Sequence, residues 1–338
     1  MPGSGRPRTV LVGCGAMGEM AAKLVYAAPD APAEVVATVD VRADRAAAVG
    51  SLLGVPGFAS LAEAVAAVEP DAADLRLPHD LHAAAVLEAL AAGLHVLVEK
   101  PLATTADDAR ALAEAARRSG RVVAVAENYP HLRTVRAAAE AIAAGRIGDL
   151  VAVRSTRAYR IGGVWVRDGW RTGAGSAAGI LLDQGTHHTS LLRRLAGDVV
   201  AVSAAPGRSA GDTVGLTLRF ASGIVGQSLY TWQTPATVVE TEATAYGTSG
   251  RIDIGIAYDT ADGRAVLTTP DAPPETLTAG ENYYDSHAVM VADFAAVIRD
   301  GRAPVVGVAD AQADLDVVLA AARSLAEGGR EIRLEEAA

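Results

Sequence analysis

The sequence predicts an α/β protein with two domains: an N-terminal, doubly wound parallel sheet, and a C-terminal α+β domain with a large, mostly antiparallel, open sheet. The chain has 338 residues, of which 50% are hydrophobic, which is enough to fill two cores. Short β-branched runs alternate with alanine-rich stretches of helical period in its first part. After about residue 147, longer alternating segments are separated by Gly, Ser and Thr turns.

The first domain is expected over residues 1–127. Apolar runs predict buried parallel strands at residues 9–13, 34–40, 71–77, 94–99 and 121–127. Helical patterns begin at residue 17 and cover residues 42–54, 60–70, 80–93 and 105–120. A repeated strand–helix–strand pattern indicates a parallel sheet with helices on both faces.

The second domain is expected over residues 128–338. Alternating segments at 215–220, 223–232 and 237–247 predict antiparallel strands. Two helices close the chain, at 286–301 and 308–329, and glycines end the second of them.

Composition and charge exclude several classes of protein. The net charge is −10 and no basic cluster stands out, which argues against a nucleic-acid partner. No apolar run approaches the roughly 18 to 20 residues of a membrane span, and the first residues lack an apolar signal segment. We therefore expect a cytoplasmic protein without a membrane partner. The single cysteine, Cys14, excludes an internal disulfide framework and a multi-cysteine metal site.

A glycine-rich motif directly follows the first predicted strand. Gly13 suits the tight turn, Gly15 lets a pyrophosphate approach the backbone, and Gly18 allows close helix packing, as in the dinucleotide-binding fingerprint. The alternative is a glycine-rich turn without a ligand, which the βαβ context disfavours. The predicted contacts with the dinucleotide in this motif are Gly13, Gly15, Ala16, Met17 and Gly18.

The end of the second predicted strand bears on the choice of cofactor. Asp40 follows Gly18 by 22 positions, near the ~20 expected for the residue that binds the ribose hydroxyls. A carboxylate there favours NAD, because it would repel a 2′-phosphate. Arg42 and Arg45 keep NADP possible, since a nearby arginine can accommodate that phosphate. Asp40, Val41 and Arg42 are predicted cofactor contacts.

The strand at 94–99 ends in an acid, a lysine and a proline. The chain carries lysine only at Lys23 and Lys100. A lysine can give up its proton when its surroundings lower its pKa, whereas an arginine cannot. Ligands of doubly wound sheets gather beyond the carboxyl ends of the strands, where Glu99 and Lys100 fall. Lys100 is therefore a candidate for proton chemistry, and a solvated strand end is the alternative.

A second candidate cluster lies in residues 179–188. Asp183 and His187 are four residues apart, so they share a face of a helix, and a carboxylate beside an imidazole orients a general base. A surface hydrogen bond is the plainer alternative. A zinc site that also used His188 is disfavoured, because adjacent helical residues point about 100° apart, and we expect no metal. For His188 a packed core position and a substrate contact both stay open.

These motifs resemble the Gfo/Idh/MocA family of NAD(P)-dependent oxidoreductases. Residues 77–105 are similar to that family over most of their length, and the similarity extends from about residue 10 to residue 334. The resemblance implies a Rossmann domain, a second domain whose open sheet packs in homodimers or homotetramers, and reversible hydride transfer at a secondary alcohol. It also implies a cis peptide bond between Lys100 and Pro101.

The resemblance assigns roles to the catalytic candidates. His187, beside Asp183, would take the hydroxyl proton as hydride leaves for the nicotinamide, and Lys100 would stabilise the developing alkoxide or share the proton work. Substrates in such proteins are mostly sugars, nucleotide sugars or cyclitols. The lack of a basic cluster favours an uncharged polyol over a phosphorylated sugar, although three arginines leave this open: Arg157, Arg160 and Arg167.

Further contacts are predicted from position along the chain and, for Pro78 and His82, from the resemblance, because similar proteins contact the cofactor at the end of the fourth strand. Additional cofactor contacts are Leu77, Pro78, His82, Glu99, Lys100, Asn128, Trp170 and Arg171. Substrate contacts are Lys100, Tyr129, Tyr159, Asp183, His187 and Tyr283. For the aromatic residues, packing is the alternative role, and His82 could be a plain helix N-terminal residue. Arg76 lies where a buried parallel strand should be apolar, and the sequence does not explain it.

We therefore predict an oxidoreductase that transfers a hydride between NAD, with NADP possible, and a secondary alcohol or ketone of a sugar, cyclitol or related polyol. Two alternatives remain. One is a redox-assisted glycosidase that releases a free sugar without net NADH. The other is a non-catalytic NAD(P)-sensing regulator, which a lysine and an Asp–His pair disfavour, because a binding protein has no need of a proton relay.

Overall fold

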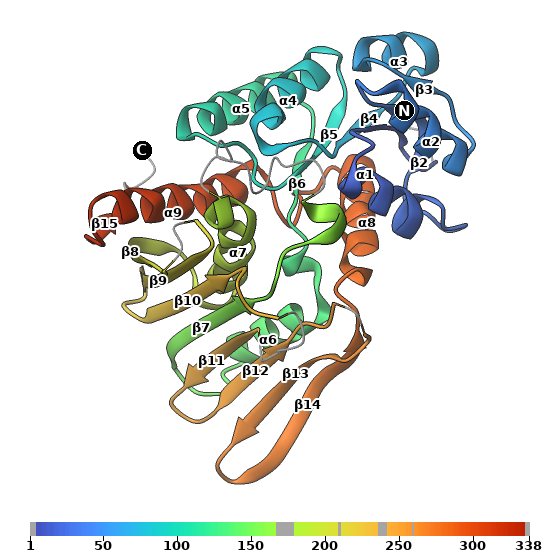
Figure 1. Ribbon diagram of the computed structural model, residues 1–338. Helices are drawn as coiled ribbons and strands as arrows, with labels where there is room; N and C mark the ends of the chain where they lie inside the picture. Colours follow the sequence, from blue (N-terminus) through green and yellow to red (C-terminus); the bar gives the residue numbers. More distant parts are fainter. Residues whose placement is uncertain (1–4, 167–178, 209–210, 236–241, 259, 335–338) are drawn as a thin grey trace. The chain divides into compact units, whose positions relative to one another are not determined.

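The chain divides into two compact units in a computed structural model, which describes residues 5–166, 179–208, 211–235, 242–258 and 260–334 (Figure 1). The first unit comprises residues 1–127 with 287–312, and the second comprises 128–286 with 313–338. The sequence analysis expected domains over residues 1–127 and 128–338. That residues 287–312 join the first unit was not predicted.

The first unit contains a six-stranded parallel sheet, which confirms the predicted doubly wound fold (Figure 1). Its strands are β1 (Arg8–Val12), β2 (Glu34–Val39), β3 (Gly57–Phe58), β4 (Ala72–Leu75), β5 (His95–Glu99) and β6 (Val123–Ala126). Their order is β3-β2-β1-β4-β5-β6. The order reverses between β1 and β4, and doubly wound sheets bind ligands beyond the carboxyl ends of the strands at such a point.

The helices of the first unit carry capping residues at some of their ends. They are α1 (Ala16–Ala21), continued by the π-helical η1 (Ala22–Tyr26), α2 (Ala43–Leu53), α3 (Leu61–Val68), η2 (His79–Leu81), α4 (His82–Ala91), α5 (Ala106–Ser119) and α8 (Asp285–Asp300). The Ser60 and Thr105 hydroxyls accept hydrogen bonds at the starts of α3 and α5. Gly54, at φ +72°, ends α2 in the left-handed conformation that glycine adopts without strain.

Helix α8 explains why residues 287–312 belong to the first unit. Its Met290, Val291 and Phe294 are buried in one cluster with Leu11 of β1 and Leu97 of β5. Apolar burial of this kind is the main favourable contribution to folding, so α8 is part of the core of the parallel-sheet unit.

The second unit contains a nine-stranded, mostly antiparallel sheet, as predicted. Its strands are β7 (Leu150–Ala158), β8 (Val199–Pro206), β9 (Thr213–Phe220), β10 (Val225–Thr231), β11 (Ala243–Gly247), β12 (Arg251–Gly255), β13 (Gly263–Thr269), β14 (Ala272–Glu281) and β15 (Ile332–Arg333). Their order is β14-β13-β12-β11-β7-β10-β9-β8-β15. Strands β7 and β10 pair in parallel, and the other described neighbours pair antiparallel.

Among the described residues, helices pack on this sheet, and side chains such as Arg154 are exposed on it. The helical segments are η3 (Tyr129–His131), α6 (Arg133–Ala143), η4 (Gly163–Trp165), the π-helical η5 (Leu181–Gly185), α7 (Thr186–Ala196) and α9 (Val308–Ala326). Helix α6 packs on β12 to β14 and α7 packs on β7. In β7, Val153 and Ser155 are buried while Arg154 is exposed, which is the alternation of a sheet with one open face. In the described part of the chain, no helix has both the length and the apolarity that crossing a membrane requires.

Candidate active site

The glycine motif after β1 is shaped to admit a ligand at one position. A Cβ atom at Gly13 would lie 2.3 Å from the Arg76 main-chain oxygen, and one at Gly18 would lie 1.9 Å from the Gly13 oxygen. Gly13 also has φ +90°, so close packing and conformation both require glycine there. At Gly15 the nearest atom would be the Arg45 Nη1, at 3.7 Å. The motif therefore packs tightly at its two ends and stays open in the middle, where the fingerprint brings a pyrophosphate against the backbone.

Asp40 lies beside this motif, at the end of β2. Its Oδ2 accepts a hydrogen bond from the Cys14 N–H at 2.8 Å, and its Oδ1 accepts one from the Arg42 N–H at 2.8 Å. Burial and the Asp40 charge raise the pKa of the Cys14 thiol to about 12, so Cys14 stays a thiol near neutral pH and is not a nucleophile. The next residue, Val41, is exposed to solvent. This arrangement fits an adenosine ribose bound at Asp40, as NAD requires.

The Glu-Lys-Pro turn follows β5, and its Lys100–Pro101 peptide bond is cis, as the family resemblance implied. The Lys100 side chain is largely buried. His82 is completely buried, with Nδ1 2.6 Å from the Pro101 oxygen and Nε2 2.9 Å from the Leu77 oxygen. At least one ring N–H therefore donates to a main-chain carbonyl, and burial lowers the pKa of the imidazole. His82 therefore joins the lysine turn to Leu77, which precedes Pro78 in the segment after β4.

The structure explains Arg76, which the sequence left open. Its guanidinium binds Asp74 through Nε–Oδ1 at 2.7 Å and Nη2–Oδ2 at 3.0 Å, and it also pairs with Glu99. Tyr26 donates its hydroxyl to Asp74 at 2.6 Å. Burial acts to lower the pKa of Arg76, but the charges of Asp74 and Glu99 outweigh it and raise the pKa. Glu99, predicted as a cofactor contact, is thus held by a buried cation next to Lys100.

Asp183 and His187 lie in different kinds of helix. Asp183 belongs to the π-helical turn η5, whereas His187 belongs to the first turn of α7. The spacing predicted one regular α-helix across both, so the π-helical turn is a difference from expectation, and such turns are frequent at functional sites. Both side chains are largely buried, and Asp183 Oδ2 accepts a hydrogen bond from Gln184 Nε2 at 3.2 Å.

The His187 imidazole stacks on Tyr129. The ring centroids are 4.8 Å apart and the rings are inclined by 15°. The Tyr129 side chain is 1% exposed, and its hydroxyl binds Glu242 at 2.9 Å and Tyr258 at 2.7 Å. The hydroxyl of Tyr129 is therefore engaged within the second unit, which fits the packing role that the sequence analysis kept as an alternative.

Aromatic side chains gather around this stack within the second unit. The cluster comprises Tyr129, Tyr159, Tyr230, Trp232, Tyr258, Tyr283 and Tyr284. Tyr159 accepts a hydrogen bond from Trp232 Nε1 at 3.1 Å. The hydroxyl of Tyr283 donates to Asn128 Oδ1 at 3.1 Å, and the Asn128 amide donates to Ser286 at 2.8 Å. The predicted substrate contacts Tyr129, Tyr159 and Tyr283 thus belong to one cluster.

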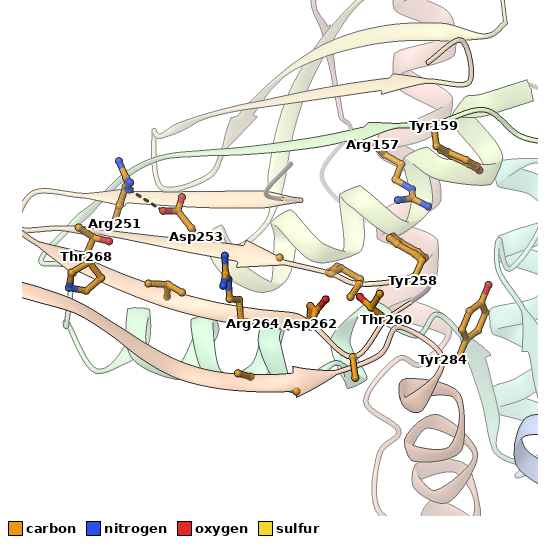
Figure 2. A pocket seen from close by; sticks show the side chains of 18 of the residues that line it. Arg157, Tyr159, Arg251, Asp253, Tyr258, Thr260, Asp262, Arg264, Thr268 and Tyr284 are labelled. Carbon is orange, nitrogen blue, oxygen red and sulfur yellow. Dashed lines mark hydrogen bonds and ion pairs between the residues drawn. The ribbon is translucent and has the colours of Figure 1, made fainter. Parts of the chain in front are cut away.

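Sequence reasoning missed Glu242, which lies just before β11 and is 3% exposed. Its Oε2 is 3.8 Å from Arg157 Nη1, and its Oε1 is 3.2 Å from His188 Nε2. His188 is completely buried, so the structure favours the packed position among its two alternatives. Arg157 lies between the rings of Tyr159 and Tyr258, 4.3 and 3.6 Å from their centroids (Figure 2).

Trp170 and Arg171 lie outside the described residues, as does Arg167. Among the residues that the structure does describe, no group of three His, Cys, Asp or Glu side chains is arranged to hold a metal ion.

The fold and these sites define a class of protein. A glycine fingerprint at the switch point of a sheet ordered β3-β2-β1-β4-β5-β6, with an acid at the end of β2, is the NAD-binding Rossmann domain. A family model described as "Oxidoreductase family, NAD-binding Rossmann fold" matches residues 7–127, and one for the GFO/IDH/MocA C-terminal domain matches residues 135–253. The chain belongs to the Gfo/Idh/MocA family of oxidoreductases, and its first unit is an NAD-binding Rossmann domain.

Characterised relatives are named as sugar-converting enzymes. A 1,5-anhydro-D-fructose reductase of Ensifer adhaerens is 33% identical, over 73% of this chain and 73% of its own length. A D-xylose 1-dehydrogenase (NADP(+)) of Haloferax volcanii is 29% identical, over 77% of this chain and 80% of its own. An inositol dehydrogenase homologue from Azotobacter vinelandii, solved with NADH and myo-inositol, has the same fold, with a TM-score of 0.84 at 21% identity over 98% of each chain. This chain is thus an oxidoreductase, and the regulator alternative is set aside.

Proposed function

We propose that this enzyme transfers a hydride between NAD and a secondary alcohol or ketone carbon of a sugar, cyclitol or related polyol. Lys100 and the Asp183–His187 pair handle the proton. Membership of an oxidoreductase family whose relatives are named for sugars supports this proposal. The single observation that carries it is Lys100: one of only two lysines in the chain, largely buried, directly after β5 of the NAD-binding sheet.

The proposed proton chemistry follows from the residues. In the oxidation direction, His187 accepts the proton of the substrate hydroxyl, and Asp183 stabilises the imidazolium that forms. Lys100 donates a hydrogen bond to the same oxygen and stabilises the negative charge that develops as the oxygen loses its proton. Bound NAD⁺ supplies the hydride acceptor, so that the alcohol becomes a ketone while NADH and one proton are released. In the reverse direction the same groups return the proton to the ketone oxygen.

The charges in the second unit favour an uncharged substrate. Arg157, which could have bound a phosphate, is instead paired with Glu242 and enclosed by tyrosine rings. A cation whose charge is already balanced gives a phosphorylated sugar little advantage over a neutral polyol. Aromatic side chains nearby supply apolar area that suits the carbon-bound faces of a sugar.

The proposal is tested with a panel of substrates. Purified enzyme is incubated with NAD⁺ and myo-inositol, D-xylose, D-glucose or 1,5-anhydro-D-glucitol, and the appearance of NADH is followed by its absorbance. We expect NADH to form with at least one neutral polyol and to form more slowly with the corresponding sugar phosphate. Release of a free sugar from a glycoside without net NADH would instead identify the redox-assisted glycosidase.

Asp40 should set the preference between NAD and NADP. Replacing Asp40 with serine removes the carboxylate that would repel a 2′-phosphate, while Arg42 and Arg45 remain close. We expect the ratio of the dissociation constants of NADPH and NADH to fall by about tenfold or more, which corresponds to about 1.4 kcal/mol. Titration of the nicotinamide fluorescence of each reduced dinucleotide measures this ratio without any substrate.

The control for Asp40→Ser is Asp107→Ser, which removes a carboxylate that is 90% exposed in the first turn of α5. It should leave both dissociation constants unchanged. An unchanged ratio in Asp40→Ser would show that Asp40 does not face the adenosine ribose.

A further inference from the structure

A buried ionic cluster, which we call the Glu242 cluster, adjoins the stacked rings of Tyr129 and His187. It consists of Glu242, Arg157, Tyr129, Tyr258 and His188, from five separate segments of the second unit. Tyr129 donates its hydroxyl to Glu242 Oε1 at 2.9 Å, Tyr258 approaches the same oxygen at 3.3 Å, and the two hydroxyls lie 2.7 Å apart. A carboxylate this deeply buried is costly unless several groups stabilise it.

The cluster keeps Glu242 charged and in place. Burial acts to raise the pKa of the Glu242 carboxyl, but Arg157, His188 and Tyr129 outweigh it, so the pKa lies below its usual value. Burial and the Glu242 charge together raise the pKa of the Tyr129 hydroxyl well above its usual value. Tyr129 is therefore a neutral phenol that donates to a carboxylate, which is a stronger hydrogen bond than one between two neutral groups.

Arg157 is fixed in turn by the aromatic rings. Figure 2 shows its guanidinium between Tyr159 and Tyr258, a cation–π arrangement that is strongest where water is excluded. Trp232 donates a hydrogen bond to the Tyr159 hydroxyl at 3.1 Å, so the Tyr159 ring is also held in place. Glu242 thus faces a cation that has little freedom to move.

One member of the cluster touches a proposed catalytic group. The ring of Tyr129 stacks on His187 at 4.8 Å, while its hydroxyl, at the far end of the same ring, is bound to Glu242. The orientation of a stacked imidazole depends on the plane that supports it. We propose that Glu242 is a positioning residue for His187, acting through the hydroxyl of Tyr129 to fix the ring on which the imidazole stacks.

The consequence for turnover depends on the proposed function, whereas the orientation of the imidazole does not. Proton transfer needs a base held within hydrogen-bond reach of the proton that it accepts, and small misplacements of a catalytic group cost rate. A freed Tyr129 ring should therefore reduce kcat without changing how tightly the substrate binds. A cluster that only stabilised the fold would lower the unfolding temperature and leave kcat of the folded enzyme intact.

The variants follow from these contacts. Tyr129→Phe keeps the stacked ring and removes its hydroxyl, with the bonds to Glu242 and Tyr258. Glu242→Gln keeps the shape of the side chain and removes its charge. Because Glu242→Gln leaves Arg157 buried without its carboxylate and could fail to fold, Tyr129→Phe is the primary test. Tyr230→Phe is the matched control, since it removes a buried hydroxyl from the same aromatic cluster. The centroid of the Tyr230 ring lies 5.0 Å from that of the His188 ring.

The first measurement needs no substrate. In protein labelled with ¹³C and ¹⁵N at its seven histidines, the carbon-bound ring protons of His187, identified by their loss in His187→Gln, report its stacking through the tyrosine ring current. We expect these signals to shift or broaden in Tyr129→Phe and in Glu242→Gln, and to stay in place in Tyr230→Phe. Unchanged His187 signals in Tyr129→Phe would overturn the proposal.

The second measurement uses a polyol found to be a substrate. We expect kcat to fall about three- to tenfold in Tyr129→Phe, with KM for the polyol and the dissociation constant of NADH unchanged. The double variant with Glu242→Gln should be no slower than the slower single variant, because both changes act on the same Tyr129–Glu242 contact and such effects are not additive. Fully additive losses, or equal losses in Tyr230→Phe, would also overturn the proposal. His187 signals that move without a change in kcat would instead contradict the role of His187 in the proposed function.

Discussion

Replacing Lys100 with methionine should reduce polyol oxidation by about 10²–10⁴-fold, the range typical for loss of a group that handles protons or charge in the transition state. Methionine keeps an unbranched side chain of similar length at this largely buried position but has no ammonium group. The substrate oxygen would then develop negative charge without a cation beside it. Initial rates of NADH formation at saturating polyol measure the effect on kcat.

The other lysine of the chain is the matched control. Lys23 is exposed and pairs with Glu19 one helical turn away, at 2.5 Å, so Lys23→Met should leave kcat and KM unchanged. In both variants, the dissociation constant of NADH should stay within about threefold of the original value, which is under 1 kcal/mol. Wild-type turnover in Lys100→Met would remove the lysine from the proposed proton chemistry.

Replacing Arg76 with methionine should cause the largest loss of stability. Asp74 and Glu99 would remain buried without their shared cation, and breaking a buried ion pair from one side costs about 3–5 kcal/mol. We expect the urea midpoint to fall accordingly at pH 7. The loss should shrink as the pH is lowered, because protonation removes the unpaired negative charges that make the variant unstable. Urea titrations followed by circular dichroism at two pH values measure both effects.

A surface arginine provides the comparison for Arg76. Arg117 binds Glu114 at 2.8 Å on the exposed side of α5, and surface pairs of this kind often contribute nothing measurable. Arg117→Met should leave the urea midpoint unchanged. Equal midpoints for Arg76→Met and Arg117→Met would show that the buried pair does not support the first unit.

Much of the first unit could be predicted from the sequence, because its signals are local. Apolar runs marked β1, β2, β4, β5 and β6, and helical patterns over 60–70 and 105–120 marked α3 and α5. Strand β3 has two residues, Gly57 and Phe58, too few to show as an apolar run. The pattern of α8 predicted a helix correctly but not which core it enters, because an apolar stripe does not identify the surface that it covers.

Candidate site residues that belong to a sequence motif could be predicted. Residues whose role depends on a contact in the folded structure could not. Gly13, Asp40, Lys100 and His187 stand in recognisable spacings. Arg76 and Glu242 do not, because the sequence around a single charged residue does not identify the partners that allow it to be buried. Glu99, which pairs with Arg76, and Arg157, which pairs with Glu242, lie far from them in the chain, so only the folded structure brings these pairs together. The π-helical turn at Asp183 was likewise hidden, since helical spacing alone does not distinguish it from an α-helix.

The discontinuous first unit has a consequence for how the protein is made. Met290, Val291 and Phe294, which complete the core around β1 and β5, are translated more than 150 residues after the end of β6. The parallel sheet therefore leaves the ribosome with an apolar flank that no nascent segment yet covers. A gene fragment that stops at residue 127 leaves this flank permanently bare, and its product should aggregate or be captured by chaperones rather than yield a free-standing nucleotide-binding module.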